Sequence, residues 1–131
     1  MLLWMLFPAI TLPESLRAIK AKAFYGCLIL TSVTFPDDLM VIENLAFYEC
    51  SSLTYVSMSK WLEDIGDWAF YGCDNLTYVY MQDSPFVYDH IQTTHRIPDL
   101  EYITFIVEPD SVAARLVKDN GFTCIYPDAV E

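Results

Sequence analysis

Lysine and arginine are scarce in this chain, which has 7 of them against 18 aspartates and glutamates and a formal net charge of -11. Nucleic acids and anionic membranes attract basic proteins and repel acidic ones, so neither is expected as a partner. Only 4 residues are glycine, and charged residues make up 19% against 54% hydrophobic residues. This composition excludes a disordered or low-complexity polymer and predicts a folded, unusually aromatic domain.

The chain also lacks the motifs of common catalytic sites. It contains no G-x-S-x-G, H-E-x-x-H or G-x-G-x-x-G pattern and no phosphate-binding loop, so neither catalysis nor a cofactor is expected. His90 and His95 have no carboxylate or cysteine at ligand spacing, which favours solvated loop histidines over a metal site. A calcium site at Asp37 and Asp38 is an alternative, but the regular Asp ladder of calcium-binding solenoids is missing.

The one long apolar run, residues 1–12, has no basic leader and no small-residue cleavage site. It is also too short to cross the roughly 30 Å hydrocarbon core of a bilayer. We therefore expect neither a signal peptide nor membrane insertion. The four cysteines include no Cys-x-x-Cys pair, which argues against zinc.

What the chain does have is an internal repeat. AFYGC occupies residues 23–27 and 69–73, and AFYEC occupies 46–50, so the interval is 23 residues. Other apolar positions recur at the same interval. They form five columns: Leu16, Leu39 and Leu62; Ile19, Ile42 and Ile65; Leu30, Leu53 and Leu76; Val33, Val56 and Val79; and Phe35, Met58 and Met81.

The repeat divides the chain into three parts. Residues 1–12 match the strand half of a truncated first repeat, and residues 13–105 hold repeats of 23–24 residues. The last copy is eroded, and a spacing of 24 predicts that Ile103 follows Val79 in its column. Residues 106–131 are expected to form a C-terminal capping unit.

Each unit reads L-x-x-I-x-x-x-A-F-x-x-C-x-x-L-x-x-V-x-Φ, where Φ is apolar. The alternation at its end predicts a strand with one buried face, whereas A-F-x-x-C favours a short helical or 3₁₀ turn. One unit cannot bury its own apolar side, so the copies must stack. The pattern therefore predicts an α/β repeat solenoid, a right-handed coil with a parallel sheet on its concave face and short helical turns on its convex face.

These motifs resemble the BspA-type leucine-rich repeats over roughly residues 7–105. The resemblance implies a protein-binding, adhesion-type module without catalytic activity, in a secreted or cell-surface protein of the kind found in many bacteria. Residues 109–126 look like the closing segment of such arrays. In that segment Ser111 is a plausible helix N-cap, and Gly121 stands where a helix C-terminus favours a left-handed residue.

Three of the cysteines fall on one position of the repeat. Cys27, Cys50 and Cys73 should therefore be buried free thiols on consecutive coils, which act as small hydrophobic residues rather than as redox groups. Cys124 has no counterpart in the repeat, and a free thiol is expected there too.

The outward strand positions form the expected binding surface, because the concave sheet of such coils is the surface used for contact. Tyrosines accumulate there, and tyrosine gives a large contact area with a polar tip. The candidate ligand-binding residues are Tyr55, Tyr78, Tyr80, Tyr102, Thr31, Thr54 and Thr77. Cross-strand stabilisation of the sheet is an equal and compatible role. A second column, Tyr25, Tyr48 and Tyr71, is expected to be partly buried between neighbouring coils.

The expected partner is a protein, such as a host extracellular or surface protein. A homodimer through the apolar N-terminal end is a further expectation, since that end lacks a cap. Two rival functions stay open. One is a structural spacer in a longer adhesin, and the other is a carbohydrate-binding module that uses the tyrosines.

Overall fold

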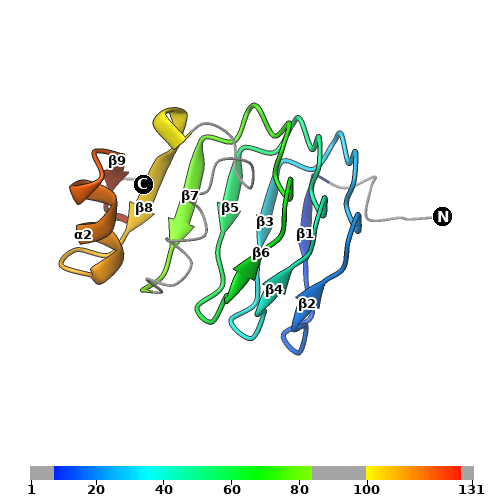
Figure 1. Cartoon of the computed structure of the whole chain (residues 1–131), viewed down its shortest axis with the longest axis horizontal. Coiled ribbons are helices and arrows are strands. Elements are labelled where there is room, and N and C mark those ends of the chain that lie inside the picture. The colour runs from blue at the N-terminus through cyan, green and yellow to red at the C-terminus, as the bar shows by residue number, and fades with distance from the viewer. Residues whose placement is uncertain (1–7, 84–99, 128–131) are drawn as a thin grey trace.

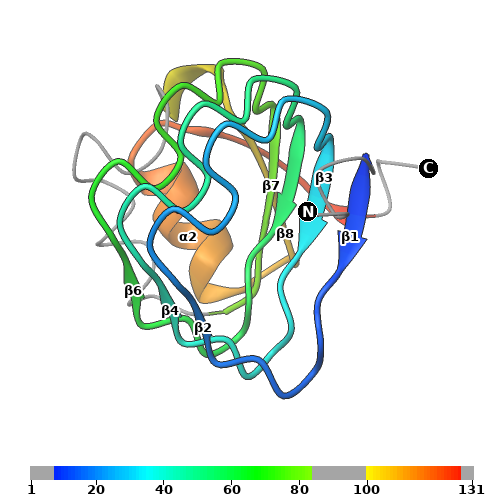
Figure 2. The ribbon, with the colours of Figure 1, turned by 90° about the vertical axis from the view of Figure 1, so that its right-hand side faces the viewer.

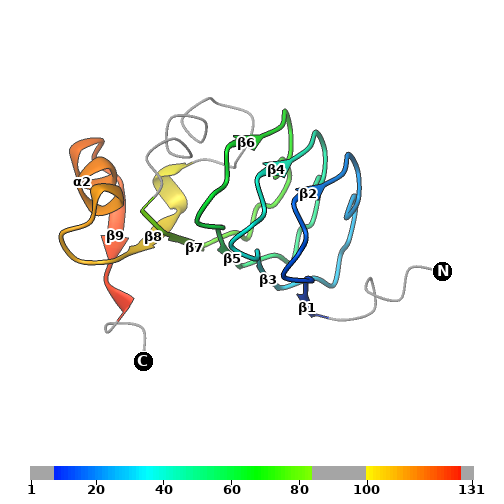
Figure 3. The same cartoon turned by 90° about the horizontal axis from the view of Figure 1, so that it is seen from below.

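The computed structural model describes residues 8–83 and 100–127, which form a parallel-strand solenoid of about 4 turns (Figure 1). This confirms the predicted repeat coil. Figure 2, which looks along the coil, shows two sheets on opposite sides of the interior. Figure 3 shows the two sheets running side by side along the array.

The larger sheet has six strands in the order β1-β3-β5-β7-β8-β9, and every neighbouring pair is parallel. Its strands are β1 (Ala9–Thr11), β3 (Ser32–Thr34), β5 (Tyr55–Ser57), β7 (Tyr78–Met81), β8 (Thr104–Val107) and β9 (Thr123–Ile125). Ser32 lies beside Tyr55, and Tyr55 lies beside Tyr78. The register thus reproduces the 23-residue interval of the sequence.

The smaller sheet was not predicted. It consists of β2 (Ala18–Ile19), β4 (Val41–Ile42) and β6 (Asp64–Ile65), which pair in parallel. Ile19, Ile42 and Ile65 point into the core, and each preceding residue faces outward. β-branched residues favour this extended backbone, and stacking at one interval brings the three short segments into hydrogen-bonding reach.

The A-F-x-x-C segments are tight turns rather than helices, which corrects the expected helical turns. The Cys27 N–H donates to the Phe24 carbonyl at 3.1 Å, as in a 3₁₀ turn. However, Lys22 and Gly26 have φ values of 62° and 67°. A left-handed residue on each side of this short turn stops a helix from propagating. No helix occurs within residues 8–83.

The predicted columns form a single core. Phe24, Phe47 and Phe70 stack in parallel, with ring centroids 4.9 and 5.1 Å apart. The expectation of buried free thiols is confirmed, since the three cysteines of the repeat are 0% exposed. Cys50 and Cys73 donate their S–H groups to the carbonyls of Phe24 and Phe47, at 3.1 and 3.2 Å. Each thiol therefore ties two coils together.

The predicted register of the fourth coil is wrong by two residues. Val79 pairs with Phe105, not with Ile103, and Tyr78 pairs with Thr104. A 3₁₀ helix, η2 (Leu100–Tyr102), immediately precedes this region. Two extra residues are therefore accommodated before β8. Ile103 is still buried, so its apolar character fits the core even though its place in the column does not.

After β8 the chain forms α2 (Val112–Asp119) and then β9 at the C-terminal end of the larger sheet (Figure 1). The Ser111 hydroxyl accepts the Ala114 N–H at 3.0 Å, so Ser111 is the helix N-cap. Gly121 has a φ of 76° just past the helix, as its position suggests. The Asp83 carboxylate accepts the Ala113 N–H at 3.0 Å and links the helix to the repeats.

Candidate functional site

The outward side of the larger sheet carries the tyrosines that the sequence singles out. Val56 and Val79 are buried, so the alternating Tyr55 and Tyr78 point away from the core. Tyr78 is 40% exposed, and Tyr55 is half-buried beside it. We call this surface the tyrosine face. It comprises Tyr55, Tyr78 and Tyr80, with Ser32, Thr34, Ser57 and Thr104 around them.

Tyr80 is fixed in place by its hydroxyl, which donates to the Glu108 carboxylate at 2.9 Å. Partial burial, and then this contact with Glu108, raise the pKa of Tyr80 above its ordinary value. The phenol therefore stays protonated at neutral pH. Its hydrogen bond connects β7 to the segment after β8 across the tyrosine face.

The candidate threonines lie just before the strands, and their hydroxyls are used within the coil. Thr31 donates to the Pro8 carbonyl at 2.8 Å, and Thr54 donates to the Thr31 carbonyl at 3.1 Å. Thr77 donates to the Asn75 carbonyl at 2.9 Å. All three are exposed, but their hydroxyl protons are engaged, so only their lone pairs and methyl groups remain for a partner.

Tyr102 does not continue the tyrosine column, which corrects its predicted place. Thr104, not Tyr102, lies beside Tyr78, because the fourth coil is shifted by two residues. Tyr102 is instead the last residue of η2 and is 73% exposed. The structure therefore brings three of the four candidate tyrosines together and places the fourth in the connection before β8.

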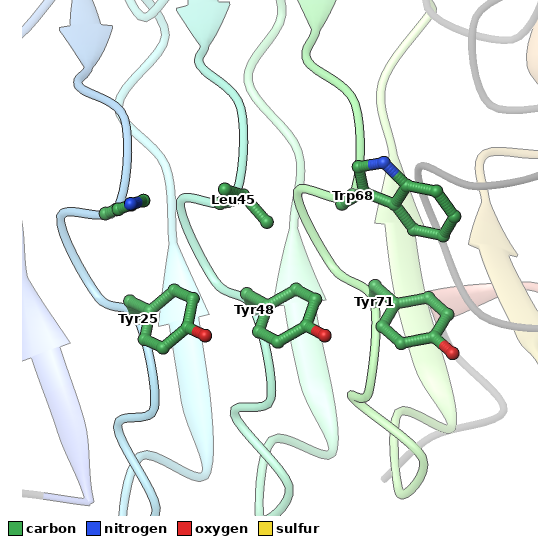
Figure 4. A pocket seen from close by; sticks show the side chains of 6 residues that line it. Tyr25, Leu45, Tyr48, Trp68 and Tyr71 are labelled. Atoms are coloured by element: carbon green, nitrogen blue, oxygen red, sulfur yellow. The ribbon is translucent and has the colours of Figure 1, made fainter.

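A second aromatic surface lies on the turn side of the coil. We call it the aromatic groove. It is lined by Lys22, Tyr25, Leu45, Tyr48, Trp68 and Tyr71 and has a volume of about 400 Å³. Figure 4 shows Tyr25, Tyr48 and Tyr71 in one row, with their hydroxyls on the same side, and Leu45 and Trp68 in a second row.

The rings of the first row are parallel to within 12° and 21°, with centroids 5.0 and 5.4 Å apart. Trp68 stands nearly perpendicular to Tyr71, with its centroid 4.9 Å from that ring. The expected partial burial holds for Tyr48, whereas Tyr25, Tyr71 and Trp68 are 46%, 47% and 44% exposed. Desolvation, followed by the neighbouring Glu49 carboxylate, raises the pKa of Tyr48.

Sequence reasoning did not identify this groove as a site. Its second row, Lys22, Leu45 and Trp68, recurs at 23 residues, but its members differ in chemistry and so give no recognisable motif. The available signal was spacing alone, because each of these residues directly precedes the Ala-Phe-Tyr of its repeat. The two rows face each other only once the turns have formed.

Among residues 8–83 and 100–127 there is no cluster of three His, Cys, Asp or Glu side chains that could hold a metal ion. That search includes Asp37 and Asp38. Asp37 accepts a hydrogen bond from the Gln82 amide at 3.1 Å. His90 and His95 lie outside the described residues. In the same part of the chain, no helix has the length and apolar character needed to span a bilayer.

Comparison with known proteins gives one match. The family model of the BspA type leucine-rich repeat region matches residues 5–95 in 6 copies. No curated protein and no solved structure matches the chain significantly. The matched residues include the first three coils, and thus most of the tyrosine face and the whole aromatic groove.

Proposed function

The chain belongs to the BspA-type leucine-rich repeat family, and from this premise we propose that it is a non-catalytic, adhesion-type module that binds a protein through its tyrosine face. Repeat modules of this family are generally non-enzymatic and commonly surface-related. The proposal places the protein outside the cell or on its surface, with a host extracellular or surface protein as its partner.

The observation that carries this proposal is the pairing of Tyr55 and Tyr78 on adjacent parallel strands, next to Tyr80. A parallel ladder on a packed core holds these rings with little conformational freedom, so little entropy is lost when a partner is bound. Tyrosines on rigid surfaces are common in interface hot spots, because they combine apolar area with a hydroxyl. The hydroxyls and methyl groups of Thr34 and Thr104 extend the same surface.

The charge of the chain restricts the partner. At a net charge of -11, a basic or neutral protein surface is favoured over an acidic one through long-range attraction. We therefore expect binding to weaken as salt concentration rises. A salt-independent interaction would point to apolar contact alone.

The test is surface plasmon resonance of the purified chain against a panel of purified extracellular-matrix proteins. A double variant, Tyr55→Ala with Tyr78→Ala, should lose binding at least tenfold while keeping the circular dichroism spectrum of the wild type. Trp61→Ala is the control, since Trp61 is 60% exposed outside both surfaces. Equal binding by the double variant would refute the role of the tyrosine face, and no binding to any panel member would favour the spacer function.

A further inference from the structure

The aromatic groove is built on a rigid frame. Backbone N–H groups in one turn donate to carbonyls in the next: Phe24 to Ala46 at 2.8 Å, and Gly26 to Tyr48 at 2.8 Å. The following pair of turns repeats this pattern, with Phe47 donating to Ala69 at 2.7 Å. The turns are thus linked like the strands of a sheet. The groove is formed before any ligand arrives, which lowers the entropic cost of binding.

One wall of the groove is made by side chains that the backbone disfavours. Lys22, Leu45 and Trp68 have φ values of 62°, 62° and 60°, in the left-handed region that glycine adopts most easily. The other left-handed column of the turns is glycine in two of three coils, at Gly26 and Gly72. Backbone geometry alone does not explain large side chains in the first column, whereas a surface role does.

The spacing of the rings selects a peptide conformation. Ring centroids are 5.0 and 5.4 Å apart, so two steps approximate one turn of a polyproline II helix, which rises roughly 9 Å over three residues. Side chains on one side of a β-strand recur every ~6.7 Å and match neither one step nor two. Trp68 and Tyr71 stand 4.9 Å apart, which admits a proline ring but not the backbone of an α-helix about 10 Å wide.

The charges around the groove select the flanking residues of that peptide. Lys22 is the only basic residue that lines it. Glu49 and Asp67, on the turns that carry Tyr48 and Trp68, are exposed, and so is Asp74, three residues after Tyr71. Carboxylates therefore surround the middle and the Trp68 side, whereas the cation lies on the first coil. A basic residue of the ligand is attracted to the Trp68 side.

We propose that the aromatic groove is a second binding site, distinct from the tyrosine face, which takes a proline-rich peptide with a basic flank in the polyproline II conformation. Its prolines pack on the tyrosine row and against Trp68, as in other aromatic grooves that recognise this helix. The ligand's arginines or lysines lie near Asp67 and Asp74. Because the helix is preformed, little entropy is lost on binding.

The test is an NMR titration of the ¹⁵N-labelled chain with a synthetic peptide of two arginines followed by three Pro-Pro-Leu triplets. We expect saturable shifts of the Trp68 indole N–H and of the Gly26 and Gly72 amides, while the Trp61 indole stays in place. Replacing every proline by alanine, or both arginines by glutamate, should weaken binding at least fivefold. Equal or tighter binding of the alanine peptide would overturn the polyproline II assignment in favour of a helix.

Trp68→Gly is the decisive variant, because glycine suits the left-handed φ of 60° and the fold is not weakened. It should bind the peptide at least tenfold more weakly at unchanged melting temperature. Trp61→Ala is the matched control and should bind like the wild type. Leu45→Gly, at a φ of 62°, tests the same wall on the middle coil and should also lose affinity.

The two proposed sites fail independently. The Tyr55→Ala, Tyr78→Ala variant should keep peptide binding, and Trp68→Gly should keep binding to any extracellular protein found for the tyrosine face. Absence of saturable shifts at millimolar peptide, retention of binding by Trp68→Gly, or displacement of the peptide by a mixture of oligosaccharides would each overturn the groove proposal. None of these outcomes bears on the tyrosine face.

Discussion

The rings of Phe47 and Phe70 lie parallel, with 2° between their planes and 5.1 Å between their centroids. Phe24 stacks on the other side of Phe47 at 4.9 Å and 3°, and Phe35 meets the same ring edge-on at 5.6 Å. Phe47 is 0% exposed, whereas Phe24 on the first coil is 7% exposed. The middle phenylalanine thus has aromatic neighbours on three sides.

Replacing Phe47 by alanine should therefore lower the free energy of unfolding by about 3–5 kcal/mol, since the cavity cannot collapse between two fixed coils. Phe24→Ala should cost less, because Phe24 stacks on Phe47 alone. Urea unfolding followed by circular dichroism measures both. Leu28→Ala is the control, as Leu28 is 61% exposed. A loss below about 1 kcal/mol at Phe47 would contradict the core assignment.

The fold was predictable because one interval of 23 residues carries it. When Leu30, Leu53 and Leu76 recur at equal spacing, stacking is the only arrangement that buries all of them, and the strand register follows. The Ile19, Ile42 and Ile65 column was recognised as core for the same reason. That its outward neighbours pair into a second sheet was not visible, because two-residue strands leave no alternation to read.

Local departures from the interval defeated the prediction. The two extra residues before β8 moved Tyr102 out of the column beside Tyr78, and nothing in the side chains marks where they enter. The candidate site suffered similarly at Thr31 and Thr54. Sequence places them at the surface, but whether a hydroxyl faces a partner or the previous coil's carbonyl depends on coil spacing.

Gly66 should be nearly irreplaceable, although its φ lies outside the left-handed region. A Cβ at this position would stand 2.5 Å from the Asn44 backbone nitrogen and 2.7 Å from the Glu43 carbonyl carbon. Gly66→Ala must therefore push two coils apart, and we expect a loss of roughly 2–4 kcal/mol, as for other overpacked sites.

Gly26→Ala is the comparison for Gly66→Ala. Gly26 has a φ of 67° but open space where a Cβ would stand, so alanine there carries only the backbone penalty of about 1–2 kcal/mol. Thermal melts of the two variants should rank them in this order. A Gly66→Ala protein as stable as Gly26→Ala would mean that the second coil does not approach Gly66 as closely as described.

The buried thiols should make the protein sensitive to alkali. Burial raises the pKa of Cys27, and a hydrogen bond with Cys50 together with burial raises that of Cys73, from 9.0. Below about pH 8 both thiols are protonated in the folded and unfolded chains, and stability is complete. As pH rises through 9, only the unfolded chain releases these protons, so stability falls by up to about 1.4 kcal/mol per thiol per pH unit.

Urea unfolding at pH 7, 8, 9 and 10 checks this slope. The double variant Cys27→Ala, Cys73→Ala should be less stable at pH 7 but should lose less between pH 8 and 10. Native labelling with a bulky disulfide reagent provides a second readout. Cys124, which is half-buried, should react first, and fast reaction of the repeat cysteines would contradict their placement in the core.

The N-terminal end of the array should be a site of association. β1 and β2 are the edge strands of the two sheets. Ile10, Leu12 and Leu16 are only half-buried, whereas the next members of their columns are buried. The first coil thus presents both strand edges and apolar side chains, a combination that favours pairing with another chain.

We predict that this end is covered either by a second copy, giving a dimer, or by residues 1–7, which lie outside the described residues. Light scattering separates the two. A dimer should dissociate when Ile10→Lys charges the end, whereas Leu28→Lys, at an exposed position elsewhere, should leave it intact. If residues 1–7 form the cover, the full chain is a monomer and its shortened form, beginning at Pro8, associates. A monomer that stays monomeric and soluble after this shortening would contradict both versions, because the apolar end would then need no cover.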